Sequence, residues 1–537
     1  MTISKTDRTL EELSQEIKEK GVKSQAAKLV QLIEKKQGVT LFHNDLDEPY
    51  IRIPMGEHFE IWPCKSKPFS RWAAGLFWNS EEEKVISSNA LSAALNVIES
   101  KACYEGEKIE LANRVCWRDG SIWYDLSDKE WRAVKIDKNG WEIVEKPPIL
   151  FRRYKHQQAQ AEPETGGDVK KLLEVVNISN RGENILFLVY IISCFIPDFP
   201  HPIINIYGQA GSAKTSLSIL LKKLIDPSSI EEDDFPRSAS EIAQKLSHNW
   251  YNCFGNVSLI SEYISNLLCK AVTGASFSKR ELYTDDEDII HKFRRCICIN
   301  GVSLAISMSD LLERTILLKL EKIPKDRRKE EKEIWKEFEK QKPMILGSIF
   351  SAVSEAIKRK DQIVLDSLPR MADFALWGCA IAEAIGYKKE DFLKAYNNNI
   401  DIQNKEVIYE NLEANLLIEF MNDKGGWEGT PTQLLNDLRA AAEKQGTRIE
   451  KEKSFPKTAN VLTRRLNLLM PNLEEAGIKI WYGEEDKRRM IYIQKVQENT
   501  DSTAGLSSEA ENSDELVDDN EFDLSSLPFQ QEVVDSQ

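Results

Sequence analysis

The sequence predicts an α/β protein of several domains built around a phosphate-binding loop. The chain has 537 residues, which is more than one hydrophobic core usually holds. The apolar run "IINIY" at 203–207 is typical of a buried strand, and a helix-like pattern of leucines begins at Leu217. Between them lies the glycine-containing segment "GQAGSAKTS" at 208–216. A strand, a glycine-containing turn and a helix in this order predict a site for phosphate.

Composition and charge indicate a soluble chain with an acidic end. Hydrophobic residues make up 41% and charged residues 30% of the sequence. The formal net charge is −15, but residues 498–537 hold twelve Asp and Glu and no Lys or Arg, which leaves −3 for residues 1–497. Local basic surfaces that bind DNA are therefore compatible with the acidic total.

Cysteine and histidine usage favours a cytoplasmic protein without a metal cluster. The nine cysteines form no CxxC pair, the six histidines show no metal-ligand spacing, and no signal peptide is recognisable. The longest apolar run, 185–196, is too short to cross a bilayer and is expected to be a buried helix. We expect no membrane partner.

Residues 1–153 are expected to form an N-terminal α+β domain whose role the sequence does not disclose. Helical spacing predicts two helices within 5–36. Short alternating segments predict strands within 38–153, interrupted by one helix around 80–104. The polar segment 154–168 predicts a linker.

Four further units are expected after the linker. They are a nucleotide-binding core at 169–325, a helical lid or connector at 326–424, a compact unit at 425–496 and an acidic, disordered tail at 497–537. The charged run 325–342 mixes both signs and is interpreted as a solvated helix face. The tail ends in "FDLSSLPFQQEVV". It is interpreted as a passive tail, with recruitment of a replication partner as the alternative.

The loop residues have the chemistry that phosphate binding requires. Gly208 and Gly211 let the backbone turn so that N–H groups point at a phosphate, and the following helix adds the positive end of its dipole. Lys214 supplies a charge for the β- and γ-phosphates, and the Thr215 hydroxyl is the expected ligand of Mg²⁺. Ala213 stands where a glycine is usual, which is interpreted as a mild departure. The expected ATP-binding residues are Gly208, Gln209, Ala210, Gly211, Ser212, Ala213, Lys214, Thr215 and Ser216.

Hydrolysis requires further groups at the ends of other strands. The segment "RRCICINGV" predicts a strand that ends at Asn300, whose amide would sense the γ-phosphate. Arg314 precedes a second strand-like run at 316–320. From spacing alone, a turn at Asn300 and a surface charge at Arg314 are equal alternatives.

Together these motifs resemble a known class of protein. Five segments carry the resemblance: "YGQAGSAKTS", "LLCKAVTGASFSKRELYTDDED", "FRRCICINGV", "SDLLERTILLKL" and "LPRMADFALWG". In this order they look like the helicase-type ATPase modules of phage and plasmid replication proteins, which are similar to superfamily 3 helicases in the AAA+ class and often accompany primases. The resemblance covers roughly 170–400. It implies a P-loop AAA+-like core with a helical lid, assembled into a homo-oligomeric ring.

The resemblance also assigns roles to single residues. It implies that Asn300 is the γ-phosphate sensor, that Arg314 is an arginine finger acting on the neighbouring subunit, and that Arg370 is a second sensor. It places the hairpin that faces DNA at 278–288. The basic residues of that hairpin are Lys279 and Arg280.

The sequence departs from this family at the second strand. Members have an aspartate there in a Phe-Asp-Asn context, whereas this chain reads "NCFGNVSLISEYI", with Gly255 at that position. Glycine cannot hold Mg²⁺ or orient a water molecule. Glu262 is the candidate catalytic replacement, with Asp285 and Asp286 as alternatives. The sequence leaves open whether bound ATP is hydrolysed.

Residues 425–496 are expected to fold as a DNA-binding winged helix. Thr430 is a helix cap, a second amphipathic helix follows, and "IKIWYGEEDKRRMIYIQKV" predicts a hairpin with a basic tip. A winged helix that binds protein instead of DNA is the alternative. The expected DNA-contacting residues are Lys457, Arg464 and Arg465 near or on the second helix and Lys487, Arg488 and Arg489 at the tip.

Two functions are open. The first is an ATP-binding, helicase-like protein of DNA replication in phage, plasmids or mobile elements, which translocates on DNA as a DNA-stimulated ATPase. The second is a nucleotide-binding scaffold or switch on DNA that does not hydrolyse ATP, which Gly255 favours. A third reading, a primase centre, lacks support because Asp45, Asp47 and Glu48 lie in a turn-like segment.

Overall fold

The structure, a computed structural model, describes most of the chain between residues 24 and 496. The described ranges are 24–80, 84–274, 294–306, 308–444, 455–485 and 488–496, with the backbone alone for 277–280, 288–291 and Glu410. Several expectations fall outside them. These are the first helix within 5–36, Asp285, Asp286, Lys487 and the acidic tail.

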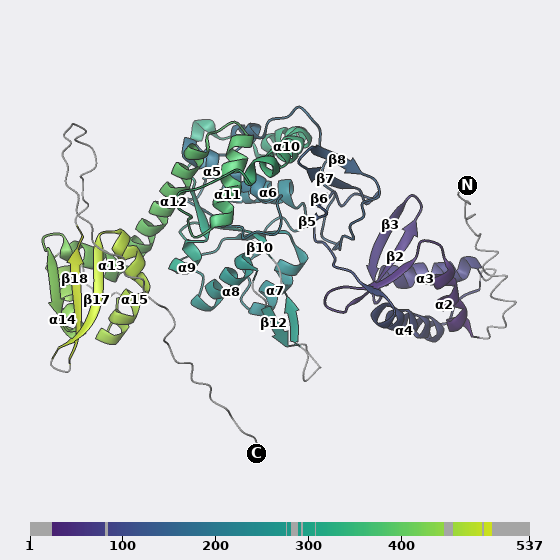
Figure 1. Ribbon diagram of the computed structural model, residues 1–537, viewed down its shortest axis with the longest axis horizontal. Helices are drawn as coiled ribbons and strands as arrows, with labels where there is room; N and C mark the ends of the chain where they lie inside the picture. Colours follow the sequence, from purple (N-terminus) through teal and green to yellow (C-terminus); the bar gives the residue numbers. More distant parts are fainter. Residues whose placement is uncertain are drawn as a thin grey trace, which may run out of the picture. The chain divides into compact units, whose positions relative to one another are not determined.

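The N-terminal residues form a four-stranded sheet covered by three helices (Figure 1). Its elements are α2 (Gln25–Lys35), β1 (Thr40–His43), β2 (Pro49–Met55), β3 (His58–Pro63), α3 (Lys67–Ser80), α4 (Ser88–Tyr104) and β4 (Glu107–Lys108), and the strand order is β3-β2-β1-β4. The helix expected around 80–104 corresponds to α4, whereas α3, which ends at Ser80, is a further helix that the sequence analysis does not predict. Phe69, Ala73 and Phe77 give α3 its own buried face, and Ser87 caps α4 by accepting the Ala90 N–H.

A second antiparallel sheet packs directly on the central core. It runs in the order β5 (Val115–Arg118), β6 (Ser121–Asp125), β7 (Ala133–Asp137) and β8 (Gly140–Val144). The ring of Tyr124 packs against Phe195 and Phe350 of the core, with centroid distances of 5.3 and 5.5 Å. This sheet therefore shares its hydrophobic interior with the region after residue 169.

The segment 154–168 differs from the open linker that the sequence predicts. Gln160 is only 6% exposed, and its Nε2 donates to the Tyr124 hydroxyl and to the Leu224 carbonyl. The Glu164 N–H donates to the Pro343 carbonyl. Polar residues of this segment make hydrogen bonds to buried groups of neighbouring elements. The segment is therefore packed against the core although its composition is polar.

The central core is a five-stranded parallel sheet flanked by helices. Its elements are η1 (Val169–Glu174), α5 (Arg181–Ser193), β9 (Ile203–Tyr207), α6 (Lys214–Ile225), β10 (Asp233–Asp234), α7 (Ala239–His248), β11 (Tyr251–Gly255), α8 (Glu262–Thr273), β14 (Cys296–Gly301), α9 (Ser309–Leu312) and β15 (Thr315–Lys319). The strand order is β10-β11-β14-β9-β15, so the loops after β9, β11 and β14 meet at one edge. Helix α5 is buried from Ile185 to Ser193, as expected.

A two-stranded hairpin lies between α8 and β14. Strands β12 (Phe277–Arg280) and β13 (Asp288–His291) pair antiparallel, with Phe277 opposite His291 and Arg280 opposite Asp288. This backbone arrangement agrees with the hairpin expected at 278–288. Only the backbones of Lys279 and Arg280 are described.

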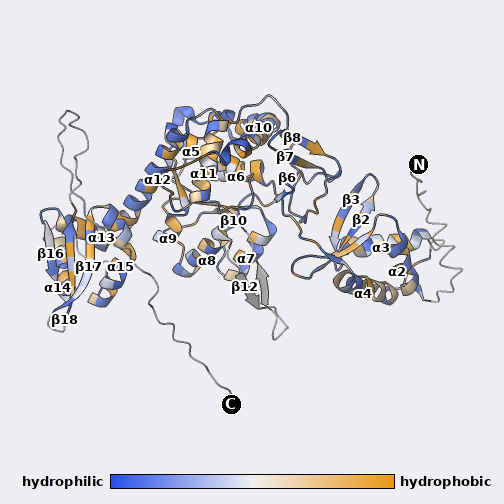
Figure 2. Ribbon diagram, viewed as in Figure 1, coloured by the Kyte–Doolittle hydropathy of each residue, from blue (hydrophilic) through white to orange (hydrophobic). Residues whose placement is uncertain are grey.

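Further helices follow the core, and one of them, α12, covers its edge strand β15. They are η2 (Lys325–Arg327), α10 (Glu331–Lys360), α11 (Ala372–Ala384) and α12 (Lys389–Glu410). Helix α12 is largely hydrophilic (Figure 2), yet Asn399 exchanges two hydrogen bonds with the backbone of Leu317, and Gln403 donates to the Thr315 carbonyl. These amides satisfy the unpaired backbone of edge strand β15.

The C-terminal unit combines three helices with a three-stranded sheet. The chain order is α13 (Leu412–Met421), β16 (Gly426–Gly429), α14 (Pro431–Lys444), α15 (Ala459–Glu475), β17 (Ile478–Glu485) and β18 (Arg488–Lys495). The sheet order is β16-β18-β17. Leu462, Leu466 and Leu469 form the buried face of α15. In the described part of the chain, no helix is long and apolar enough to span a bilayer.

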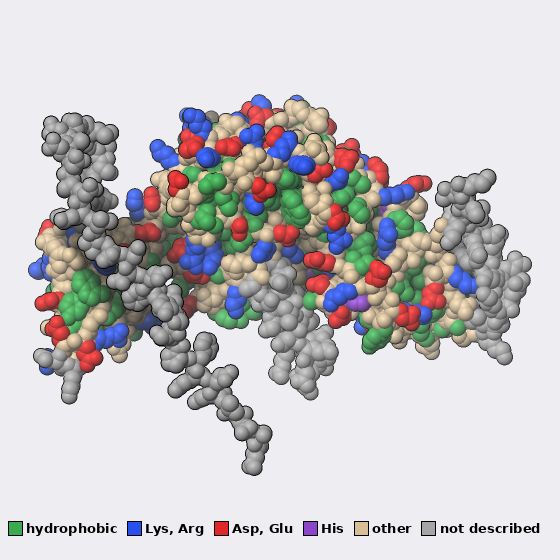
Figure 3. Space-filling model, viewed as in Figure 1, with side chains coloured by type: hydrophobic (Ala, Val, Ile, Leu, Met, Phe, Trp, Pro, Cys, Tyr) green, Lys and Arg blue, Asp and Glu red, His purple; other side chains and the backbone are tan. Residues whose placement is uncertain are grey.

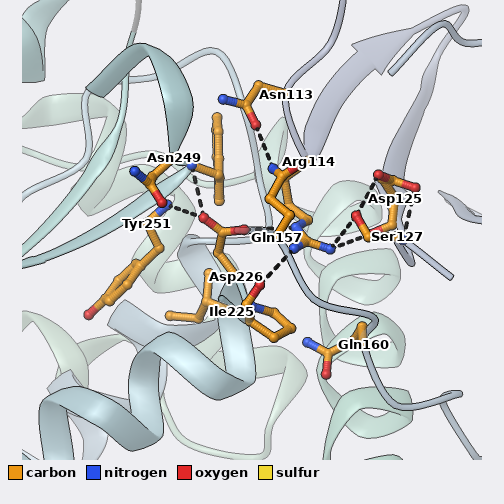
Figure 4. A network of polar contacts seen from close by, with 12 residues as sticks. Asn113, Arg114, Asp125, Ser127, Gln157, Gln160, Ile225, Asp226, Asn249 and Tyr251 are labelled. Atoms are coloured by element: carbon orange, nitrogen blue, oxygen red, sulfur yellow. Dashed lines mark hydrogen bonds and ion pairs between the residues drawn. The ribbon is translucent and has the colours of Figure 1, made fainter. Parts of the chain in front are cut away.

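A buried charge network joins the second sheet to α6 and β11 (Figure 4). Asp226, at the end of α6, accepts Arg114 Nε at 2.8 Å and Lys222 Nζ at 3.0 Å, and the N–H groups of Trp250 and Tyr251 complete its coordination. The Arg114 and Asp226 side chains are 0% exposed. Burial alone would raise the pKa of Asp226, but the two cations and the hydrogen bonds outweigh it and lower that pKa.

Replacing Asp226 with Asn should strongly destabilise the fold. The change leaves Arg114 and Lys222 buried without their counter-charge, which costs about 3 kcal/mol or more. We expect a clearly lower thermal midpoint by circular dichroism. Glu174→Gln, which removes an exposed pair with Lys171, is the control and should change the midpoint little. An unchanged midpoint for Asp226→Asn would contradict the importance of this network.

His201 should make stability depend on pH. It is 1% exposed, and burial together with the nearby charges of Arg294 and Arg295 lowers its pKa to about 3. Its contribution is complete above the unfolded-state pKa of about 6.5 and is lost as the pH falls toward 3. Compared with His201→Phe, the native chain should lose about 2 kcal/mol more unfolding free energy between pH 7 and pH 5. Urea unfolding at both pH values tests this, and parallel losses would refute it.

Candidate functional site

The loop between β9 and α6 has a backbone that requires glycine at two positions. Gly208 has φ +148°, and a β-carbon there would lie 2.2 Å from the Leu320 carbonyl oxygen. Gly211 has φ +83°, and its carbonyl accepts the Ile323 N–H at 3.2 Å. The chain that leaves β15 therefore supports the loop from one side.

Ala213 adopts a conformation that suits glycine better. It is the N-cap residue of α6, with φ +66° and ψ +29°, and it makes no side-chain capping bond. The departure from glycine is thus less mild than the added methyl group suggests, because a left-handed residue with a β-carbon costs about 1 kcal/mol or more. The uncapped N–H groups and the dipole of α6 face the loop.

Polar groups of the loop fit an anion. The buried Ser212 hydroxyl has no hydrogen-bond partner among the described residues. Lys214 Nζ donates to the carbonyls of Gly208 and Gln209 at 2.8 and 3.0 Å, so the cation lies over the loop. Partial burial lowers the pKa of Lys214. An anion in the loop would accept from Ser212 and pair with Lys214.

Thr215 and Arg328 complete the surroundings of the loop. Thr215 is exposed on the first turn of α6. A β-carbon on Gly211 would lie 3.5 Å from Arg328 Nη2, so this exposed guanidinium lies beside the loop. Arg328 belongs to the mixed charged run that sequence reasoning treated as a solvated face, and opposite charges along that run hid its position.

A hydrogen-bonded cluster lies where the parallel strands end. Asn300, 1% exposed at the end of β14, donates from Nδ2 to Ser218 Oγ at 2.8 Å and to Glu232 Oε1. The Ser218 hydroxyl lies 2.8 Å from Glu232 Oε1 and 3.0 Å from the Thr215 carbonyl. Asn300 Oδ1 accepts the Asn256 N–H at 3.2 Å. The cluster connects β14, the end of β11 and the first turns of α6.

Glu232 is the carboxylate nearest the end of β11. A β-carbon on Gly255 would lie 2.2 Å from Glu232 Oε2. Glu262, the replacement considered from the sequence, is an exposed residue at the start of α8. The sequence does not reveal Glu232, because Glu232 precedes β10 and comes close to Gly255 only when the strands pair in the sheet.

Arg314 lies at the opposite end of the sheet. It directly precedes β15, where its carbonyl accepts the Ile203 N–H at 2.9 Å, whereas the loop follows the other end of β9. Five residues of strand separate these ends by about 16 Å. Arg314 Nη1 is 2.7 Å from Asp310 Oδ1, and Arg370 also pairs with Asp310. Arg370 therefore lies beside Arg314 and not beside the loop.

Partial burial would raise the pKa of Asp310, but hydrogen bonds with Arg314 and Cys269 and the charges of Arg314 and Arg370 outweigh it and lower that pKa. Asp310 is thereby held ionised between two arginines at this edge.

The three candidate DNA-binding residues near or on α15 differ in their surroundings. Lys457 and Arg464 are exposed, whereas Arg465 pairs with the buried Glu413 of α13 at 3.3 Å. Arg465 thus holds α15 to α13, which departs from its expected place on a free DNA-binding face.

The basic residues of the β17–β18 hairpin are opposed by acids. Arg488 and Arg489 are exposed, but Glu485 and Glu484 stand directly opposite them in the strand register. Across the face of the molecule seen in Figure 3, basic and acidic side chains are intermixed. The positive charges of Arg488 and Arg489 are therefore offset by the two acids opposite them.

Magnesium fits this site only with help from phosphate oxygens. Among the described residues, no group of three or more His, Cys, Asp and Glu is placed to hold a metal. Mg²⁺ at nucleotide sites commonly uses one or two protein oxygens together with phosphate and water. The Thr215 hydroxyl and the Glu232 carboxylate are donors of this kind.

The fold and the site describe a mixed α/β protein with a parallel sheet whose polar groups meet at one edge. Residues 169–406 match the family described as actinomycete integrative conjugative element replication protein, and residues 414–509 match the family described as AICE RepA C-terminal domain. Both regions are therefore similar to replication proteins of conjugative elements.

Solved structures of a protein named NrS-1 are also similar to this chain. The structure described as "The A form apo structure of NrS-1 C terminal region-CTR(305-718)" covers 87% of this chain and 98% of that chain, with 12% identity and a TM-score of 0.38. The structure described as "The apo structure of NrS-1 C terminal region (305-718)" covers 89% and 100%, with 13% identity and a TM-score of 0.38. No curated protein matches the chain.

Ala213→Gly should stabilise the protein. Relief of the left-handed strain exceeds the added freedom of the unfolded chain, so we expect a gain of about 0.5 kcal/mol and a slightly higher thermal midpoint. Ala210→Gly is the matched control, because Ala210 lies in the same loop without a positive φ, and it should lower the midpoint. Equal effects of the two variants would contradict the conformation assigned to Ala213.

Proposed function

We propose that this chain is an ATP-binding, helicase-like replication protein of a mobile genetic element. One observation carries the proposal, namely that the loop before α6, Asn300 and a carboxylate meet at the carboxyl edge of a parallel sheet. Ligands bind at this edge in open α/β folds. Residues 169–406 match a family of replication proteins of conjugative elements, which supports a role in the replication of such an element.

Each group has a defined task toward a bound nucleotide. Loop N–H groups and the Ser212 hydroxyl hold phosphate oxygens, and Lys214 leaves the loop carbonyls to pair with the β- and γ-phosphates. The Asn300 amide would sense the γ-phosphate or the attacking water. The Thr215 hydroxyl would hold Mg²⁺, which would supply positive charge to neutralise the phosphates.

The position of Arg314 supports action between subunits. It is about 16 Å from the loop of its own chain, along the length of β15. An arginine at that distance stabilises the transferred phosphoryl group only in a neighbouring copy. The proposed active assembly is therefore a ring in which each Arg314 completes the next site.

DNA contact is assigned to two places. The β12–β13 hairpin is one, and the C-terminal unit is the other, because its order of helix, strand, two helices and hairpin is that of a winged helix. Lys457 and Arg464 are the exposed basic residues of the second site. The match of residues 414–509 to the AICE RepA C-terminal domain covers this unit.

A scaffold that binds ATP without hydrolysing it is the second candidate. The observation that favours it is Gly255, which removes the acid from the end of β11. The two candidates share nucleotide binding and differ in turnover.

Purified protein should bind ATP with Mg²⁺ and hydrolyse it faster with single-stranded DNA. Lys214→Ala should weaken ATP affinity at least tenfold in calorimetry, because it removes the cation over the loop. Arg314→Ala should retain affinity and lose at least tenfold in turnover. A preparation that binds no ATP contradicts both functions, and binding without turnover assigns the scaffold.

Mixing the two variants tests the action between subunits. In a mixed ring, an Arg314→Ala subunit has an intact loop and receives Arg314 from its Lys214→Ala neighbour. We therefore expect a mixture to regain part of the activity that each variant lacks. A mixture no more active than its components would contradict the trans role.

A further inference from the structure

The carboxylate beside Gly255 at the candidate site comes from Glu232, which precedes β10 and lies 23 residues before Gly255 in the sequence. We propose that Glu232 replaces the missing second-strand aspartate as the carboxylate that serves Mg²⁺ and the attacking water. This inference rests on the proposed nucleotide binding. It differs from the replacement expected from the sequence, Glu262, which is exposed at the start of α8.

In its present conformation, the Glu232 side chain fills the space that a side chain at position 255 would need. A β-carbon on Gly255 would lie 2.2, 2.4 and 2.8 Å from Oε2, Cδ and Cγ of Glu232. Non-bonded carbon atoms prefer separations of about 3.5 Å or more. The end of β11 therefore lacks a side chain in the space that the Glu232 carboxylate fills. The loss of one acid and the presence of the other are a single structural exchange.

Two neighbouring side chains orient the carboxylate. Asn300 Nδ2 and Ser218 Oγ both contact Oε1, the latter at 2.8 Å. The backbone next to Glu232 is also fixed, because Asp233 pairs with Phe254 in parallel register. With its contacts to Asn300 and Ser218 made through Oε1, the carboxylate directs Oε2 toward Gly255.

The carboxylate lies within reach of the nucleotide loop. Ser218 occupies the turn of α6 that follows Thr215, and its hydroxyl lies 3.0 Å from the Thr215 carbonyl. One helical turn rises about 5.4 Å, a distance that one water molecule bridges. A single carboxylate is sufficient, since Mg²⁺ in such sites keeps several waters and uses phosphate oxygens.

The corresponding reaction is balanced. The oxygen of a water bonds to the γ-phosphorus as the bond from that phosphorus to the β,γ-bridging oxygen breaks, and the electron pair leaves with ADP. Glu232 holds this water by a hydrogen bond, accepts the proton that it loses and returns it to solvent.

The first test compares Glu232→Gln with two matched controls. Gln keeps an oxygen for Asn300 and Ser218 but removes the charge. Glu231→Gln changes the adjacent acid, which pairs with Lys223, and Glu262→Gln changes the replacement expected from the sequence. The readout is the ratio of ATP affinities with and without Mg²⁺, measured with a fluorescent ATP analogue, alongside hydrolysis.

Glu232→Gln should keep its Mg²⁺-free affinity within about twofold and lose at least tenfold of the enhancement that Mg²⁺ gives, whereas both controls should resemble the native chain. The inference is overturned if Glu232→Gln keeps both the native affinity and the native Mg²⁺ enhancement. It is also overturned if only Glu262→Gln loses them. If the native chain binds no ATP at all, the proposed function itself fails.

A second test moves the carboxylate back to β11. Gly255→Asp alone should lose the Mg²⁺ enhancement, because the new side chain collides with Glu232. The double variant Glu232→Ala with Gly255→Asp should recover at least part of it, because Ala vacates the space. If the ratio of ATP affinities with and without Mg²⁺ is the same in the single and the double variant, the proposed exchange between Glu232 and a carboxylate at position 255 is contradicted. Circular dichroism identifies any variant that fails to fold.

Discussion

The ion cluster at Asp226 is the constraint on which the arrangement of the core depends. One buried carboxylate holds Arg114 of the second sheet, Lys222 of α6 and two backbone N–H groups at the start of β11. Such a cluster is unfavourable when incomplete, so all its partners must be present together. It thereby fixes α6 against β11, and the loop before α6 and the end of β11 take their relative positions from this contact.

The edge of the sheet that binds ligands follows from that arrangement. Asn300 lies in β14 and Glu232 directly precedes β10, yet the two side chains share a hydrogen bond beside the first turns of α6. Arg314 lies at the other edge, paired with Asp310. The same parallel sheet thus separates the groups proposed to hold a nucleotide from the arginine proposed to act on a neighbouring copy. This separation gives a physical reason for assembly.

Residue periodicity predicted those strands and helices that depend only on neighbours in the sequence. The β-branched run before Gly208, the buried helix α5 and the strand that ends at Asn300 follow from residue periodicity. Interactions between distant residues were not predictable in this way. Glu232 fills the space beside Gly255 from another strand, Arg465 binds a buried acid on α13, and Gln160 satisfies interior groups from a polar segment. Helix α3 was missed although Phe69, Ala73 and Phe77 have helical spacing.

The proposed roles of Lys214, Asn300 and Glu232 all require that Mg²⁺ and ATP bind at the carboxyl edge of the parallel sheet. The most direct measurement is an experimental structure of the full chain with Mg²⁺ and a non-hydrolysable ATP analogue. We expect phosphates in the loop from Gly208 to Thr215, with Lys214 turned away from the loop carbonyls and the Glu232 carboxylate beside the metal and its waters. Phosphates bound elsewhere, or a metal served by Glu262 with Glu232 unmoved against Gly255, would contradict it.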